Sequence, residues 1–583
     1  MIIAATVRRI SAGVCILTAC CTPVLAAAPL PLESTDGMVV TAQHEASDVG
    51  AAILRQGGNA IDAAVAVGYA LAVTHPCCGN LGGGGFMTIH LADGRNTFIN
   101  FREKAPQAAS ANMYLDAAGN AVSARSLDGY LAVGVPGTVM GLETARQKYG
   151  TLTRAALIAP AIRLAADGFL VTRGDVDVLE DATKAFREQP NVAAIFLKHG
   201  ETLSPGDRLV QKDLAATLRA ISEGGPDAFY RGAIPAAVAA ASRAGGGILT
   251  AEDFAAYTAT EAAPITCSYR GYTIVSAPPP SSGGVTLCEM LQVLANYPLR
   301  TLGFHSAASI HAMAEAMRFA YKDRNTYLGD PAFIQNPIER LLSSAHIEEI
   351  RSQIHAGHAT PSSSLKGQTA GDERPTTTHY SVADKLGNVV SVTYTINNDF
   401  GAKIIAGNTG FFLNDEMDDF TAKPGVPNLF GLVQGKANAI APGKRPLSSM
   451  TPTLVLKDGK PVLIVGTPGG SRIITTVLEV IVNVLDHGMS LQEAVDAPRM
   501  HHQWLPDTVA GEPYAFSADT ARALTAMGYK VVDLEPWGAG NAAEAIGIAP
   551  ADAKAAQALG FPRAARFYGA SDSRAPAGSA AAP

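Results

Sequence analysis

Apolar residues recur at every third or fourth position in several stretches of the chain, a spacing that predicts helices with a buried face. Most of these stretches end near Gly or Pro, where helices commonly stop. The stretch at residues 61–73 is apolar but contains Asp62 and is too short to cross a membrane, so it predicts a buried helix. The predicted helices span residues 46–56, 61–73, 138–149, 157–167, a segment from about 286, 310–328 and 472–485.

Alternation of apolar and polar residues at successive positions predicts two β-hairpins in the second half of the chain. The first joins strands at residues 376–384 and 389–395 through a Lys-Leu-Gly-Asn turn. The second joins strands at residues 453–457 and 461–465 through Asp458-Gly459. Helices and short strands also alternate between residues 45 and 265, so both kinds of element contribute to the expected core.

The first hairpin places hydroxyl groups on one face of its strands. A turn centred on Leu386 sets Thr377 opposite Thr395, and the Cβ atoms of such opposed residues lie about 4.5–5.5 Å apart. The cluster has two interpretations, a reactive site or ordinary cross-strand pairs, because Thr is a common strand residue. The opposed pairs are Thr377–Thr395, His379–Thr393 and Ser381–Ser391.

Two glycine-rich segments indicate close approaches of the backbone. The run at residues 82–85 gives the chain room to pass close to a partner, which can simply be another strand. Gly469 and Gly470 lie between a strand and a helix, where backbone N–H groups and the helix N-terminus converge. This second segment predicts either an oxyanion hole or a plain strand–helix connection.

Two polar or small-residue segments lack the apolar positions that a packed element needs. Residues 352–375 are rich in Ser, Thr, Gly and His and predict a mobile, exposed connection just before the hydroxyl-rich hairpin. Residues 575–583 are mostly small and predict a disordered tail.

The first 26 residues have the pattern of a secretory signal peptide. Arg8 and Arg9 precede an apolar stretch at residues 10–19, and small residues follow near Ala26. We therefore expect an exported protein, in the bacterial periplasm or secreted. The Leu-Thr-Ala-Cys segment ending at Cys20 is also similar to a lipobox, which would attach a lipid anchor at Cys20 and tether the protein to a membrane.

The composition of the 583-residue chain narrows the class of protein further. Apolar residues make up 47% and charged residues 17%, which is ample for a large core and too apolar for a disordered chain. The net charge of −7 argues against a nucleic-acid partner. No segment after the leader has about 20 uninterrupted apolar residues, so no transmembrane helix is expected.

Cysteine and histidine spacing predicts neither a disulfide framework nor a metal site. Four cysteines follow the leader, too few for a framework in a chain of this length, and one adjacent pair does not suit an easy disulfide. We expect small buried side chains instead. The closely spaced His pairs at 355/358 and 501/502 lack the context of a zinc site. The four cysteines are Cys77, Cys78, Cys267 and Cys288.

The G-x-S-x-G, H-E-x-x-H and P-loop motifs of other enzymes do not occur in the sequence. Several long motifs, in matching order from about residue 38 to about 574, instead resemble those of the γ-glutamyltranspeptidase family. Their number and order make the resemblance specific. The motifs lie at residues 74–86, 101–106, 278–284, 377–382, 393–397, 414–420, 444–450, 468–472 and 569–572.

The resemblance implies an N-terminal-nucleophile hydrolase of the α+β class, a four-layer αββα sandwich made from one precursor. Members of the family cut themselves, and the matching bond here lies between Thr376 and Thr377. The cut would separate a large subunit, residues 27–376, from a small catalytic subunit, residues 377–583, which form one intertwined heterodimer. The implied substrates are γ-glutamyl compounds such as glutathione, with water, amino acids or dipeptides as acceptors and no cofactor.

The resemblance also implies a role for each residue of the site. Thr377 is the nucleophile, held by Thr395. Its freed α-amino group, with a reference pKa of about 7.7–8.0, is suited to act as the general base. The N–H groups of Gly469 and Gly470 would bind the oxyanion. The substrate carboxylate would be bound by Arg102, Ser448 and Ser449, and its ammonium by Asn397, Glu416 and Asp419.

Two positions depart from the pattern usual in bacterial members. Glu416 stands where Gln is frequent, which adds negative charge near the expected ammonium. Phe430, in a segment at residues 424–435 similar to the family's lid loop, stands where Tyr is common. Loss of that hydroxyl would loosen lid closure and shift the balance from transfer toward hydrolysis.

Two other functions are compatible with these motifs. A β-lactam side-chain (glutaryl) acylase of the same fold would use Thr377 but bind a group without an ammonium, which the carboxylate of Asp419 disfavours. A non-catalytic periplasmic protein that binds glutamate or glutathione would need no chain cleavage at all.

Overall fold

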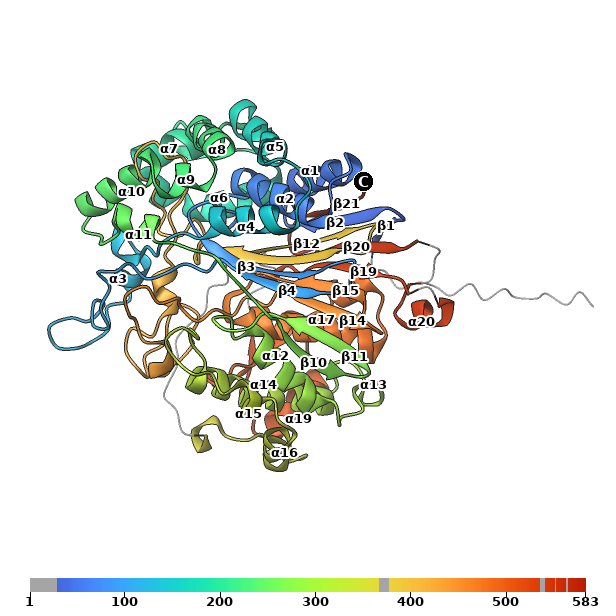
Figure 1. Cartoon of the computed structure of the whole chain (residues 1–583). Helices are drawn as coiled ribbons and strands as arrows, with labels where there is room; N and C mark the ends of the chain where they lie inside the picture. The colour runs from blue at the N-terminus through green and yellow to red at the C-terminus, as the bar shows by residue number, and fades with distance from the viewer. Residues whose placement is uncertain (1–28, 366–376, 535–540, 551, 562–564) are drawn as a thin grey trace, which may run out of the picture.

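Two facing seven-stranded sheets form the centre of the computed structural model (Figure 1). The structure describes residues 29–365, 377–534, 541–550, 552–561 and 565–583. The expected signal peptide, Cys20 and Thr376 lie outside the described residues. Within the described part of the chain, no helix combines the length and the apolar character needed to span a membrane.

The first sheet is antiparallel throughout and carries the hydroxyl-rich hairpin near its middle. Its strand order is β21 (Ser579–Ala581), β2 (Gly37–Thr41), β12 (Thr378–Asp384), β13 (Val389–Thr395), β3 (Gly84–His90), β4 (Asn96–Asn100) and β9 (Thr260–Ala262).

The second sheet is also antiparallel and packs against the first through an apolar layer that includes Val40, Val389, Ile464 and Ile546. Burial of these side chains from both sheets supplies the main attraction between the two layers. Its strand order is β1 (Leu32–Ser34), β20 (Phe567–Ser571), β19 (Glu544–Ile548), β15 (Lys460–Gly466), β14 (Thr453–Lys457), β11 (Tyr272–Ser276) and β10 (Ile265–Tyr269).

Helices cover the outer face of each sheet, so the predicted four-layer αββα sandwich is confirmed (Figure 1). The first sheet is covered by α1 (His44–Arg55), α2 (Ala60–Thr74) and α4 (Thr138–Tyr149), with α5 (Arg154–Asp167) and α8 (Lys212–Gly224) behind them. The second is covered by α12 (Gly283–Leu294) and α17 (Ile473–Val482), with α14 (Ala307–Tyr327) and α16 (Ser344–Gln353) behind them.

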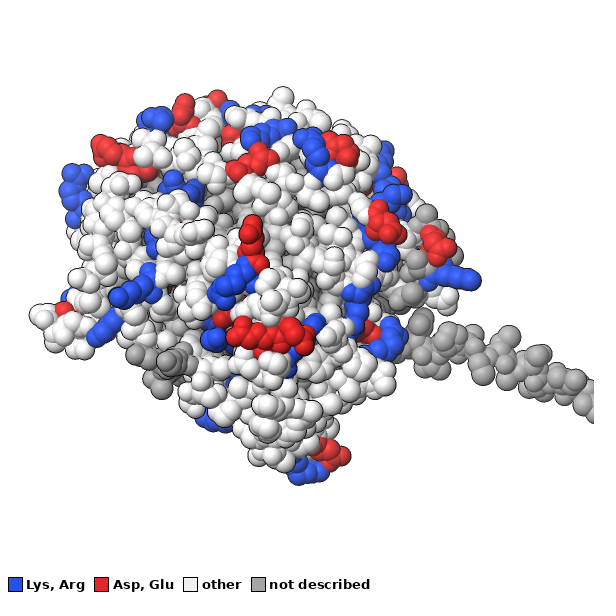
Figure 2. Space-filling view, turned by 60° about the horizontal axis from the view of Figure 1, so that its bottom comes forward, with Lys and Arg blue, Asp and Glu red and all other residues white. Residues whose placement is uncertain are grey.

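The remaining α-helices and strands lie outside these layers or at their edges. They are α3 (Ala124–Leu127), α6 (Arg173–Arg187), α7 (Pro190–Phe196), α9 (Pro226–Tyr230), α10 (Ala233–Ala244), α11 (Ala251–Ala255), α13 (Leu299–Leu302), α15 (Ile338–Leu341), α18 (Leu491–Asp496), α19 (Ala518–Ala526) and α20 (Ala553–Ala558), and the strands β5 (Phe169–Leu170), β6 (Leu197–Lys198), β7 (Glu201–Thr202), β8 (Arg208–Leu209), β16 (Met500–His501), β17 (Val509–Gly511) and β18 (Val531–Asp533). On the face in Figure 2, acidic and basic side chains are interspersed and much of the surface is uncharged.

Capping side chains set the ends of the predicted helices. The apolar helix α2 begins at Ala60 because Asn59 and Asp62 form a reciprocal capping box. The carboxylate of Asp62 also accepts hydrogen bonds from the backbone N–H groups of Thr151 and Leu152, which accounts for its burial. The prediction of α4 at residues 138–149 matches its observed bounds.

The register predicted for the β12–β13 hairpin is confirmed. His379 lies opposite Thr393, and Ser381 lies opposite Ser391. The carboxylate of Asp384 fixes the turn, because it accepts hydrogen bonds of 2.9–3.0 Å from three successive backbone N–H groups, those of Leu386, Gly387 and Asn388.

Three expectations from the sequence are wrong. The four cysteines form two disulfides, Cys77–Cys78 and Cys267–Cys288, and the second joins β10 to α12. The tail is ordered, because β21 pairs with the edge of β2 through backbone hydrogen bonds that small side chains do not hinder. Part of the expected exposed connection is packed, since Thr360 and Ser362 are buried.

The C-terminal strand protects the edge of the first sheet, and its removal is expected to destabilise the protein. Deletion of residues 578–583 uncovers the N–H and C=O groups of β2 and should lower the Tm and promote aggregation. Differential scanning calorimetry and light scattering measure both effects. Deletion of residues 582–583 alone, which leaves β21 intact, is the control; equal effects of the two deletions would contradict this role.

Candidate active site

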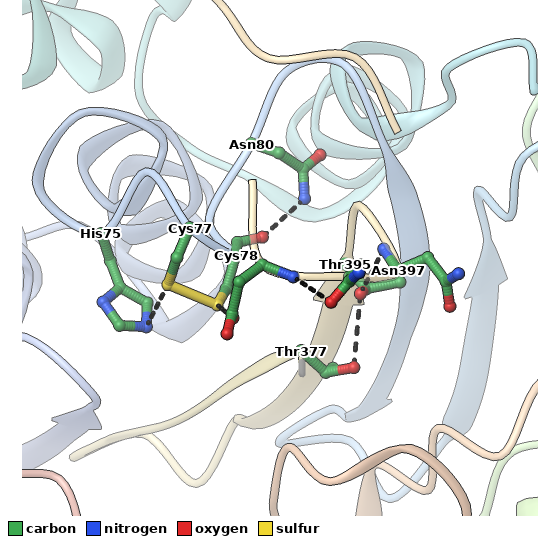
Figure 3. Close-up of a disulfide and its surroundings, with 9 residues drawn as sticks. His75, Cys77, Cys78, Asn80, Thr377, Thr395 and Asn397 are labelled. Carbon is green, nitrogen blue, oxygen red and sulfur yellow. Dashed lines mark hydrogen bonds between the residues drawn. A yellow bond between two sulfur atoms is a disulfide. The ribbon is translucent and has the colours of Figure 1, made fainter. Parts of the chain in front are cut away.

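The nucleophile candidate Thr377 lies at the entry to the central strand β12 (Figure 3). Its side chain is buried, and its hydroxyl donates a hydrogen bond of 3.3 Å to the hydroxyl of Thr395 at the end of β13. The backbone N–H of Asn397 donates to the same Thr395 oxygen at 2.9 Å. The two Thr hydroxyls predicted to face each other are therefore in contact.

Most of the site residues predicted from the sequence line a single cavity. Its walls include the two Thr hydroxyls, the Arg102 guanidinium and the carboxylates of Glu416 and Asp419. Met450 and Ile473 also line it and were not predicted as site residues; Met450 ends the motif at residues 444–450, but neither apolar side chain carries a signal that separates it from an ordinary core residue. The predicted residues in its walls are Arg102, Thr377, Thr395, Asn397, Glu416, Asp419, Phe430, Ser448, Ser449 and Gly470.

Among the described residues that line this cavity, Arg102 carries the only positive charge, and it is fully buried. It follows β4, and its guanidinium forms ion pairs with both Glu416 and Asp419. These acids are three residues apart on a single 3₁₀ turn, Glu416–Asp419, a spacing that places side chains on the same face. The carboxylate of Glu103 lies 3.5 Å from the same guanidinium.

Burial governs the protonation of this charged cluster. It raises the pKa of Glu103 to about 7 and raises the pKa values of Glu416 and Asp419, although Arg102 opposes each shift. Burial alone would lower the pKa of Arg102, but the surrounding carboxylates raise it above its usual value. The cavity therefore keeps one permanent cation and an excess of carboxyl groups.

A second buried arginine, which the sequence did not indicate, lies behind the serines. Arg324 on α14 donates hydrogen bonds of 2.9 Å to the hydroxyls of Ser449 and Ser282. Because the Ser449 oxygen is used as an acceptor, its proton is left to point elsewhere. Burial lowers the pKa of Arg324 to about 10. In the sequence it is one of several charged residues on a helix, which is typical of a solvated face.

Phe430 closes one side of the cavity against Gly470. The Phe430 backbone N–H donates to the Asn428 side chain at 3.1 Å, and its carbonyl accepts a hydrogen bond of 3.1 Å from Gln503. A Cβ atom at Gly470 would overlap the Phe430 ring, and Gly470 has a φ of 56°. Gly469 precedes it with a φ of 134° and is not among the residues that line the cavity.

Two other groups in the described part of the chain bring three metal-ligating atoms close together. In the first, His75 adjoins Cys77 and Cys78, whose sulfurs are bonded to each other. In the second, Glu289, Asp323 and His346 are packed outside the cavity, with His346 Nε2 2.6 Å from Asp323.

Comparison with known proteins identifies the family. The model of the γ-glutamyltranspeptidase family matches residues 46–582. The chain belongs to the γ-glutamyltranspeptidase family. The resemblance inferred from the motifs is thus confirmed, and the chain is an enzyme.

Individual relatives cover nearly the whole chain. The glutathione hydrolase proenzyme of Pseudomonas sp. (strain A14) is 56% identical over 550 residues, 94% of each chain. That of Escherichia coli (strain K12) is 51% identical over 514 residues, 87% of this chain and 88% of the relative. The crystal structure of cephalosporin acylase from Bacillus halodurans has a TM-score of 0.81 at 26% identity, covering 96% of this chain and 98% of that one. The shared fold therefore does not by itself specify which acyl group is bound. The residues of the cavity have to be compared with each acyl group.

The contact between Gly470 and Phe430 predicts a specific cost for a side chain at position 470. G470A should lower the Tm and kcat/KM, because Ala at positive φ costs about 1–2 kcal/mol and the new methyl group collides with the ring. G407A is the matched control, since Gly407 has a φ of 55° and open space around it. The decrease in Tm and kcat/KM that G470A shows beyond G407A should become smaller when the ring is absent, that is, when F430A/G470A is compared with F430A. An equal decrease with and without the Phe430 ring would refute the contact.

Proposed function

We propose that the protein cuts itself between Thr376 and Thr377 and then hydrolyses or transfers the γ-glutamyl group of glutathione and related compounds. The observation that carries this proposal is the cavity at Thr377, where a hydroxyl nucleophile faces both a buried guanidinium and carboxylates. A γ-glutamyl group ends in a carboxylate and an ammonium on one carbon, so it needs both kinds of partner.

The nucleophile gains its base from chain cleavage. A Thr hydroxyl is weakly acidic and reacts poorly unless a neighbouring group removes its proton. A free α-amino group on Thr377 has a reference pKa of about 7.7–8.0, close to the working pH of a general base. Thr395, which accepts the Thr377 hydrogen bond, supports the orientation of the attacking oxygen.

The acyl group then passes through two steps. Thr377 attacks the γ-carbonyl, and the amine of the donor leaves as the acyl-enzyme forms. Water, an amino acid or a dipeptide next attacks the ester and releases the nucleophile. The backbone N–H groups of Gly469 and Gly470, at the start of the 3₁₀ turn that leads into α17, are the proposed donors to the oxyanion.

Substrate binding is proposed to exchange ion pairs within the cavity. The α-carboxylate of the donor takes the planar guanidinium of Arg102, which suits bidentate pairing, with Ser448 and Ser449 as hydroxyl donors. The α-ammonium takes the carboxylates that Arg102 holds in the free enzyme, Glu416 and Asp419. Asn397 adds an amide group beside them.

The proposal also covers chain cleavage and export of the protein. The products of cleavage are a large subunit of residues 27–376 and a small subunit of residues 377–583, joined as a heterodimer. The relatives carry proenzyme names, which supports a precursor. We propose export by the leader, to the periplasm or beyond, with a lipid at Cys20 as an optional tether.

A glutaryl acylase is the second candidate, because a solved cephalosporin acylase shares the fold over almost the whole chain. A glutaryl group presents a terminal carboxylate but no ammonium. It would pair with Arg102 and release Glu416 and Asp419 without a cation, and unpaired buried carboxylates are costly. The observed carboxylates therefore favour the γ-glutamyl donor.

Replacement of Thr377 tests maturation and chemistry together. T377A should remain a single chain on a denaturing gel, whereas the wild type gives two bands, because Ala has no hydroxyl to attack the preceding bond. Turnover of a γ-glutamyl anilide should fall by a factor of at least about 10³. T377S keeps the hydroxyl and should still be cut. A single intact band from turnover-competent wild-type protein would refute the proposal, and an uncut, inactive wild type would favour a binding protein.

The carboxylates should discriminate between donors. D419N should raise KM for a γ-glutamyl anilide by about thirtyfold or more, the cost of removing one partner of a buried ion pair. A glutaryl anilide, which lacks the ammonium, is the internal control and should be affected less. Steady-state kinetics with both anilides measure the difference. Faster wild-type turnover of the glutaryl anilide would establish the acylase instead.

A further inference from the structure

The Cys77–Cys78 disulfide lies in the loop that connects α2 to β3, beside Thr377 and Thr395 of the β12–β13 hairpin (Figure 3). The Cys78 N–H donates to the carbonyl of His75 at 3.1 Å, and the Asn80 side chain donates to the Cys78 carbonyl at 2.9 Å. The same Asn80 side chain accepts the N–H of Gly83 at 3.0 Å. These bonds give the loop one defined shape.

This loop supports the segment that carries Asn397. The Phe400 N–H donates to the Cys77 carbonyl at 2.8 Å, and Cys78 Sγ lies 3.6 Å from an oxygen of Asp399. At the other end of the segment, Asn397 is tied to the Thr395 hydroxyl. A change in the shape of the disulfide loop therefore reaches the cavity wall through only three residues.

A separate small cavity, about the size of a water molecule, borders one of the two cysteines, Cys77, which is only 2% exposed. It is lined by Cys77, His75 and Phe400, together with apolar residues that include Phe169 and Leu209. Cys78 is not among its lining residues. A thiol reaches the disulfide only when this loop opens locally, and Cys77 is then the cysteine on the cavity side.

We propose that Cys77–Cys78 is a thiol–disulfide exchange site for small thiols, and that its oxidised form positions Asn397 for γ-glutamyl binding. The exchange stands on the geometry of the loop and its cavity, whereas the effect on binding rests on the function proposed above. The donor class for that function includes a thiol peptide, so the enzyme would work in the presence of its own reductant.

The exchange takes two thiols. The thiolate of the first attacks Cys77 Sγ, the bond to Cys78 breaks, and a mixed disulfide forms while Cys78 leaves as a thiolate. The second thiol attacks the outer sulfur of the mixed disulfide, which frees Cys77 and releases the two small thiols as a disulfide. Two electrons pass from the small thiols to the two cysteines.

Two titratable side chains, Asp399 and His75, lie beside the sulfur atoms of the disulfide. Burial raises the pKa of Asp399 to about 7, so its carboxyl is partly protonated at neutral pH and can protonate the Cys78 thiolate. A disulfide sulfur has no proton, so in the oxidised state only the carboxyl can donate across this contact. Burial lowers the pKa of His75 to about 4, so the ring 3.3 Å from Cys77 Sγ stays neutral at neutral pH and takes up no second proton; the attacking thiol therefore arrives already ionised, as a thiolate.

The second disulfide provides a matched control. Cys267–Cys288 joins residues 21 apart in sequence and ties β10 to α12, away from the two cavities. A cross-link between adjacent residues closes almost no chain, so its loss should change global stability less than loss of Cys267–Cys288. A change in KM on loss of the Cys77–Cys78 disulfide would therefore indicate that it positions Asn397, and not that the whole protein has become less stable.

The test uses the mature, cleaved enzyme and N-acetylcysteine, a thiol without a free α-amino group to act as acyl acceptor. After treatment, alkylation and peptide mass spectrometry should find Cys77 and Cys78 labelled and Cys267–Cys288 intact. KM for a γ-glutamyl anilide should rise about fivefold with kcat within about twofold, a modest coupling energy. Reoxidation with diamide should restore the original KM.

Variants separate the two parts of the proposal. C77S/C78S should show the raised KM without any thiol and no further response, whereas C267S/C288S should keep the low KM and the response. Absence of labelling at Cys77 and Cys78 in the folded wild type would overturn the exchange. Labelling with an unchanged KM would overturn the positioning of Asn397. If the cleaved enzyme turns over no γ-glutamyl anilide with Cys77–Cys78 either oxidised or reduced, the proposed function is refuted. Alkylation of Cys77 and Cys78 would still show whether the exchange occurs.

Discussion

The buried guanidinium of Arg102 holds together the segments that form the candidate active-site cavity. Its ion pairs reach the 3₁₀ turn of Glu416 and Asp419, and its Nε donates to the carbonyl of Pro446 at 3.3 Å. Its own carbonyl accepts hydrogen bonds from Tyr257 and Arg445. A charge with no exposed surface is tolerated only when it is paired, so these segments must come together whenever the protein folds. The same pairs hold a guanidinium and two carboxylates side by side on the cavity wall, the arrangement proposed to receive the two charges of the donor.

The arrangement of strands explains how a cut beside Thr377 can leave the site undisturbed. β12 is hydrogen-bonded on one side to β2, from before the proposed cut, and on the other to β13, from after it. Each sheet mixes strands from residues 27–376 and 377–583. The two proposed subunits therefore cannot separate without breaking both sheets, and a new chain end at Thr377 stays anchored by a central strand.

The sequence predicts what depends on local periodicity and turn chemistry, and misses what depends on distant partners. The β12–β13 register follows from a short turn that one side chain, Asp384, holds in place. The alternation of residues on the two strands is therefore enough to predict which residues lie opposite each other. The Cys267–Cys288 disulfide needs the packing of α12 on β10, which no spacing reveals. β21 pairs through its backbone, so its small side chains leave no pattern. Arg324 becomes a site residue only because α14 is buried behind Ser449. The charged residues of the cavity came from motif resemblance rather than from periodicity.

The glycine run before and in β3 joins these separate features. A Cβ atom at Gly83 would overlap the carbonyl oxygen of Thr395, so only glycine lets this loop lie against the end of β13. That close approach places the end of the disulfide loop directly against the strand end that carries Thr395. The loop therefore contacts the hairpin at Gly83 and the Asn397 segment at Phe400, whose N–H donates to the Cys77 carbonyl. The proposed influence of the Cys77–Cys78 disulfide on the cavity rests on these two backbone contacts.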